Sequence, residues 1–235
     1  MLTYDIIANV FAYLSPKERY SCLYISKLWN ELTTPLIWAA PKPETARQLN
    51  YLVYTLNQTR RRRIRNLWRK AIFNILATNS NCLKRYPFFQ SREDYFSTRD
   101  YGVMIQILDL SEVKGKEMIT DYMITTMARN CPNLIKANLY NCFNLTDKSI
   151  SQLLTRSSHL TWLSLSVCTG ITDEALLPLT TLQRSCPLTH LSLNFTLIQG
   201  KYLSKVLEVN PDLNLTLDQT NLYNVKHHRT NRHLA

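Results

Sequence analysis

Residues 160–173 read LTWLSLSVCTGITD, and this stretch decides the fold because its pattern returns along the second half of the chain. Three leucines open it, spaced by three and then two residues. The same spacing recurs at Ile105, Leu108 and Leu110; at Leu134, Ala137 and Leu139; and at Leu188, Leu191 and Leu193. The closing Thr172-Asp173 pair has counterparts at Thr120-Asp121 and Thr146-Asp147, so the period is 26 residues.

A repeat of this length with leucines at these positions is typical of a leucine-rich-repeat solenoid, in which each unit contributes a strand and a helical segment. We therefore predict an α/β fold with parallel strands inside and helices outside over residues 105–220, in about five units. The leucines would point into the core, and the residues between them would face a partner. Such solenoids present a surface more often than a catalytic pocket.

Four residues on neighbouring predicted strands form the candidate substrate-binding patch. Trp162 falls between two core leucines, and an aromatic side chain exposed there would mark a binding surface. Lys136, Tyr140 and His190 occupy outward positions on the adjacent strands. Cover of Trp162 by another segment of the chain remains an alternative. The Thr-Asp pairs are interpreted as helix caps, which is a structural role.

The first forty residues carry a different pattern. Apolar residues from Ile6 to Leu14 follow helical spacing, and Ser15-Pro16 is a signal for the start of a second helix. The segment 2–38 resembles an F-box, although Thr3 stands where that family usually has proline and Tyr20 where leucine is common. The matching positions are Leu2, Asp5, Ile6, Ile7, Val10, Phe11, Leu14, Ile25, Lys27, Trp29, Leu36 and Trp38.

The resemblance implies a three-helix unit that docks on a Skp-family adaptor, and through it on cullin and RING subunits. The adaptor contacts would come from Leu2, Ile6, Ile7, Val10, Phe11, Leu14, Leu23 and Trp29. Together with the repeats, the chain is similar to F-box/leucine-rich-repeat proteins of the cysteine-containing type. This similarity implies the substrate-recognition subunit of an SCF-type E3 ubiquitin ligase, which binds a protein for degradation and performs no chemistry itself. The alternative is a non-catalytic scaffold that sequesters a partner without ubiquitin transfer.

The sequence favours no enzyme, cofactor or metal. Motifs for a nucleophile elbow, a zinc protease or a phosphate-binding loop are missing, and the chain has only 4 Gly. The 6 Cys form no C-x-x-C pair, and buried thiols in a reducing compartment explain their places in the repeat. Such a compartment is the cytoplasm or the nucleus, where we expect the protein. No apolar run reaches the length that a membrane helix needs.

The net charge of +11 is uneven along the chain. Residues 1–104 hold 16 basic and 7 acidic residues, whereas residues 105–220 hold 9 and 10. Much of the excess positive charge lies in the run 60–70. Three interpretations of this run are a nuclear localisation signal, a phosphate-binding patch and a solvated helix face, and the composition favours the solvated helix face. Nucleic-acid binding is disfavoured because the repeats are nearly neutral.

These patterns divide the chain into four parts. Residues 1–40 form the F-box, and residues 41–104 a helical or irregular linker and repeat cap that includes the basic run. The repeats occupy residues 105–220. A basic, disordered tail is expected over residues 221–235.

Overall fold

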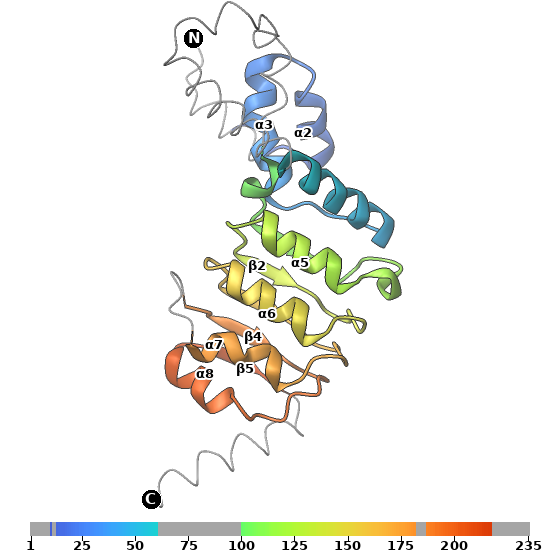
Figure 1. The fold of residues 1–235 in the computed structure, drawn as a ribbon. Helices are drawn as coiled ribbons and strands as arrows, with labels where there is room; N and C mark the ends of the chain where they lie inside the picture. Colours follow the sequence, from blue (N-terminus) through green and yellow to red (C-terminus); the bar gives the residue numbers. More distant parts are fainter. Residues whose placement is uncertain (1–9, 11–12, 61–99, 182–186, 218–235) are drawn as a thin grey trace, which may run out of the picture.

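The computed structural model of this chain describes residues 10, 13–60, 100–181 and 187–217. These residues form a mixed α/β fold whose five parallel strands lie side by side in chain order, with helices along one side of the sheet (Figure 1). The predicted mixed class and the parallel strands are therefore confirmed. The basic residues 61–70 and the tail 221–235 lie outside the described residues.

Each strand is three residues long and pairs in register with the next, so that equivalent positions of successive repeats stand opposite one another. The strands are β1 (Ile107–Asp109), β2 (Lys136–Asn138), β3 (Trp162–Ser164), β4 (His190–Ser192) and β5 (Asn214–Thr216). Lys136 thus lies opposite Trp162, and Trp162 opposite His190. Residues at equivalent positions of successive repeats therefore form rows across the sheet.

The helical segments follow the strands and vary more than the strands do. They are η5 (Lys116–Met118), α5 (Asp121–Asn130), α6 (Asp147–Arg156), η6 (Asp173–Leu176), α7 (Leu177–Thr181) and α8 (Leu203–Val209). In α6, Ile150, Leu153 and Leu154 are buried at helical spacing, which turns one face towards the sheet. Polar and charged residues, among them Lys148, Thr155 and Arg156, occupy the other face.

The core consists of the residues that the repeat marks as inward. All twelve positions of the four predicted strand motifs are fully buried, as are Ile119, Leu145 and Ile171 before the Thr-Asp pairs. The thiols of Cys131, Cys142 and Cys168 are also buried and free of disulfides. Burial raises the pKa of Cys142 to about 12, so this thiol stays neutral and packs as a small apolar group.

Two helices, α2 (Pro16–Cys22) and α3 (Lys27–Ala39), lie at the N-terminal end of the stack (Figure 1). Ser15 and Glu18 cap α2 reciprocally: the Ser15 N–H donates to the Glu18 carboxylate at 2.7 Å, and the Glu18 N–H donates to Ser15 Oγ at 3.4 Å. Hydrogen bonds from Ser15 lower the pKa of Glu18. Ser26 accepts from the Trp29 N–H and caps α3.

The N-terminal helices are joined to the sheet by direct contacts. The Gln106 N–H donates to the Ala39 carbonyl at 2.8 Å, and Trp38 stacks on Tyr101 with ring centroids 4.2 Å apart. Tyr101 belongs to η4 (Tyr101–Met104), which leads into β1. The end of α3 is therefore anchored beside the first strand.

A helix over residues 46–60 covers the first repeat. Its buried side chains Ala46, Leu49, Val53 and Leu56 belong to the same core as the strand leucines. A short parallel bridge between Thr45 and Lys114 holds its start. This helix shields apolar residues of the first unit, as terminal layers of repeat proteins require.

Within the described parts of the chain, three residues other than glycine have positive φ, and they occupy the same position of successive repeats: Asn141 (58°), Val167 (63°) and Phe195 (56°). Asparagine tolerates this left-handed conformation, whereas β-branched valine is strained in it. We expect Val167→Asn, which copies Asn141 of the preceding unit, to stabilise the protein by about 1 kcal/mol. Urea denaturation measures the change, and Val103→Asn is the control because Val103 does not have positive φ. A lower free energy of unfolding for Val167→Asn than for the wild type would contradict the strain argument.

Candidate partner-binding face

Alternate strand residues form one face of the sheet, which we call the strand face. Its first row contains Ile107, Lys136, Trp162, His190 and Asn214, and its second row contains Asp109, Asn138, Ser164, Ser192 and Thr216. Residues of the first row are half-buried or exposed. Between the rows, Leu108, Ala137, Leu163 and Leu191 are fully buried and Leu215 is partly buried. The predicted division between core leucines and outward residues holds for the first row. Ser164 and Ser166, which were predicted to face outward, are buried, and Ser166 is hydrogen-bonded to Ser192 of the next strand.

Three of the four predicted substrate-binding residues meet in the first row. The ring of Trp162 stacks on His190 with centroids 5.0 Å apart and planes 5° from parallel. The Lys136 ammonium lies 4.2 Å from the centroid of the same indole. Because β2 and β4 flank β3 on opposite sides, the cation and the imidazole occupy opposite faces of the indole, and cation–π attraction holds the lysine there.

Tyr140, the fourth predicted residue, contacts a lysine that the sequence analysis missed. Its ring lies 5.1 Å from the Lys116 ammonium, which also donates to the carbonyl oxygens of Ser111 and Tyr140 at 2.6 and 2.8 Å. Lys116 comes from η5, between β1 and α5 of the first repeat, where no strand alternation points to it. The predicted patch thus contains two separate cation–aromatic contacts, one around Trp162 and one around Tyr140.

The polar groups beside these contacts are mostly engaged within the protein. Asp109 accepts from the N–H and the hydroxyl of Ser111 at 3.0 and 2.7 Å. Ser166 and Ser192 share a hydrogen bond of 2.7 Å. The strand face therefore combines a row of small hydroxyl and amide groups with the Lys136–Trp162–His190 stack.

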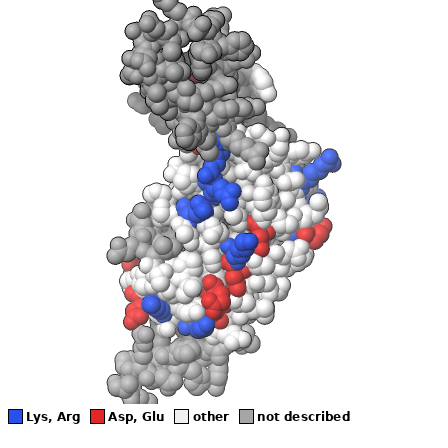
Figure 2. Space-filling model, in the orientation of Figure 1, with Lys and Arg blue, Asp and Glu red and all other residues white. Residues whose placement is uncertain are grey.

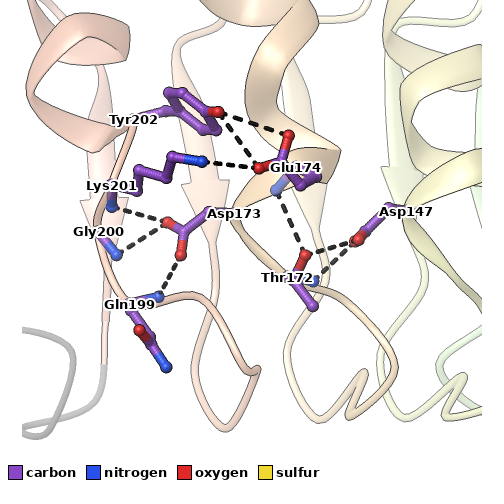
Figure 3. Close-up of polar contacts among 8 residues, drawn as sticks. All are labelled: Asp147, Thr172, Asp173, Glu174, Gln199, Gly200, Lys201 and Tyr202. Atoms are coloured by element: carbon purple, nitrogen blue, oxygen red, sulfur yellow. Dashed lines mark hydrogen bonds and ion pairs between the residues drawn. The ribbon is translucent and has the colours of Figure 1, made fainter.

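Acidic residues of the Thr-Asp pairs hold successive repeats in position. Asp121 accepts from the Thr146 N–H and hydroxyl at 2.9 and 2.6 Å, and Asp147 accepts from Thr172 in the same way at 2.7 and 2.6 Å. Asp173 accepts from three backbone N–H groups, those of residues 199–201, each at 2.9 Å (Figure 3). Each carboxylate therefore binds the following turn of the stack.

This arrangement corrects the predicted role of the Thr-Asp pairs. Thr120 and Thr146 stand at helix N-caps but make no side-chain cap hydrogen bond, and Thr172 makes only a 3.4 Å one to the Glu174 N–H. The carboxylates bind groups about one repeat away instead of N–H groups of their own helix. Their role is structural, as expected, but they link repeats.

The carboxyl group of Asp121 responds to two opposing influences. Partial burial acts to raise its pKa, but hydrogen bonds from Ser149 and Thr146, with the nearby Lys148, outweigh that effect and hold the pKa below its usual value. A lowered folded-state pKa contributes stability above the unfolded-state value that is lost as the pH falls. This link between repeats therefore weakens in acid.

The predicted adaptor-binding residues are only partly described. Val10 is exposed, Leu23 is half-buried, and Leu14 and Trp29 pack against a small cluster of Cys22 and Leu32. The remaining four lie outside the described residues: Leu2, Ile6, Ile7 and Phe11.

The described residues contain no group of three or more His, Cys, Asp and Glu side chains placed to hold a metal ion. In the same parts of the chain, no helix combines the length and apolar character needed to cross a membrane. Acidic and basic side chains are interspersed on the face shown in Figure 2. That face does not offer the one-signed surface typical of a polyanion-binding protein.

Comparison with known proteins does not assign this chain to a family. No protein-family model matches the chain, and no curated protein matches it significantly.

Proposed function

We propose that this chain is the substrate-recognition subunit of an SCF-type E3 ubiquitin ligase. Its N-terminal helices dock on a Skp-family adaptor, and its strand face binds a substrate protein. The chain itself performs no chemistry: it raises the local concentration of the substrate beside the ubiquitin-loaded enzyme. The F-box and leucine-rich-repeat assignments on which this proposal depends come from the sequence resemblance.

The observation that supports it most directly is the apolar surface of the N-terminal unit. Val10, Tyr13, Tyr24 and Ile25 are all exposed, with Tyr13 at 91% and Tyr24 at 88%. Exposed aromatic and apolar side chains are candidates for contact with another protein. They lie in the part of the chain that resembles the adaptor-binding motif, beside α2 and α3, and the anchored end of α3 would transmit a fixed orientation to the repeats.

Adaptor binding is the direct test. We expect purified chain to capture a Skp-family adaptor, and Ile7→Ala combined with Phe11→Ala to weaken capture at least about 100-fold, because buried apolar anchors dominate such interfaces. Pull-down and calorimetric titration would measure this. Tyr54→Ala is the matched control, since Tyr54 is an exposed aromatic on helix 46–60, outside the motif.

Two outcomes would count against the ligase role. Equal capture by the wild type and the double variant would mean that the motif does not form the contact. A folded wild type that captures no adaptor would favour the scaffold function, in which the repeats hold a partner without delivering it for ubiquitin transfer.

A further inference from the structure

Among the described residues, the polar groups of the Lys136–Trp162–His190 stack have no hydrogen-bond or ion-pair partner. Both faces of the indole are occupied, so a ligand can reach Trp162 only at the ring edge. Across the described residues, neither the indole N–H nor the Lys136 ammonium donates a hydrogen bond, and neither Lys136 nor His190 forms an ion pair. The three side chains line one row in register.

Charge in this row is uncompensated. The carboxylate of the strand face, Asp109, lies on β1 in the second row and is bound to Ser111. The first row presents one fixed positive charge, an indole N–H and an imidazole. These groups are suited to anionic oxygen atoms, with which charge-assisted hydrogen bonds are the strongest.

We infer that this row binds an acidic segment of the partner protein, whose Asp or Glu carboxylates accept from Lys136 and Trp162. The inference rests on the proposed partner-binding role of the strand face and names the class of partner it takes. A carboxylate fits better than a phosphate, because the row has no arginine, the residue best matched to phosphate by its bidentate geometry. An extended segment lying across the strands would place alternate side chains along the row.

A peptide titration tests this without any adaptor, so its failure is separate from failure of the ligase proposal. The probe is a short fluorescein-labelled peptide with Glu at alternate positions, and its twin has Gln at those positions. We expect the Glu peptide to bind, the Gln twin to bind at least about 10-fold more weakly, and Lys136→Gln to weaken binding about 10-fold. Trp162→Phe, which keeps an aromatic ring but removes the N–H, should also weaken it.

The matched control is Lys148→Gln, which removes the same charge from an exposed position on α6. It should leave binding within about 2-fold of wild type, because exposed charges far from a ligand are largely screened at physiological salt. Thermal unfolding of each variant confirms that the fold is retained.

Three results would overturn the inference. One is an equal loss on Lys136→Gln and Lys148→Gln, which would indicate diffuse charge attraction. Another is weaker binding of the Glu peptide to Arg61→Gln but not to Lys136→Gln, which would place the binding in the basic run. The third is tighter binding at the row by a phosphoserine peptide or by single-stranded RNA than by the Glu peptide.

Discussion

Replacing Asp173 by alanine is expected to lower the free energy of unfolding by about 3 kcal/mol, because it removes the acceptor of three backbone N–H groups. The N–H groups of Gln199, Gly200 and Lys201 each donate to this carboxylate at 2.9 Å, and the carboxylate itself is buried (Figure 3). No water can replace it fully at Gly200, which is buried as well. Equilibrium urea unfolding followed by circular dichroism measures the loss.

The adjacent carboxylate provides the control. Glu174 is exposed, and it pairs at 2.9 Å with Lys201, which is exposed too; this contact lowers the pKa of Glu174. Exposed ion pairs contribute little to stability, so Glu174→Ala should barely move the unfolding midpoint. The loss of stability in Asp173→Asn should lie between those of Asp173→Ala and Glu174→Ala, since the amide oxygen of asparagine remains as an acceptor. Equal effects of Asp173→Ala and Glu174→Ala would refute the proposed link between repeats.

Gly102→Ala is expected to destabilise the protein by about 3 kcal/mol, because a methyl group there has no room. A Cβ atom on Gly102 would lie 2.0 Å from the carbonyl oxygen of Asn130 and 2.9 Å from its carbonyl carbon. Both are backbone atoms at the end of α5, so the clash cannot be relieved by a side-chain rotation. Thermal and urea unfolding of the variant would show the loss.

Gly115→Ala separates the effect of contact from that of backbone conformation. Gly115 has φ of 78°, but the nearest atoms to an added Cβ, on Ala46 and Glu117, are 3.7 Å away. We expect only the cost of a left-handed alanine, about 1 kcal/mol. A larger loss at Gly115 than at Gly102 would mean that the close approach of Gly102 to α5 is not the reason for glycine there.

The strand face was largely predictable from the repeat. Because the period is constant, equivalent residues align across parallel strands, and the sequence therefore predicted Lys136, Trp162 and His190 on adjacent strands of one face. The contact of Lys116 with Tyr140 was not predictable, since Lys116 comes from a short turn whose path depends on packing. The adaptor-binding assignment stays a prediction, and four of its eight residues lie outside the described parts of the chain: Leu2, Ile6, Ile7 and Phe11.

The sequence by itself determined which apolar residues of the strand motifs are buried and that the strands are parallel and in order. The spacing of hydrophobic residues within one repeat indicates which side chains face the core, and the constant period gives each repeat the same arrangement. Only the tertiary structure decided which polar groups pair. Asp121 and Thr146 are 25 residues apart, and so are Asp147 and Thr172. A Thr-Asp pair is equally suited to capping its own helix, and the close stacking of one repeat on the next is what gave these carboxylates their partners.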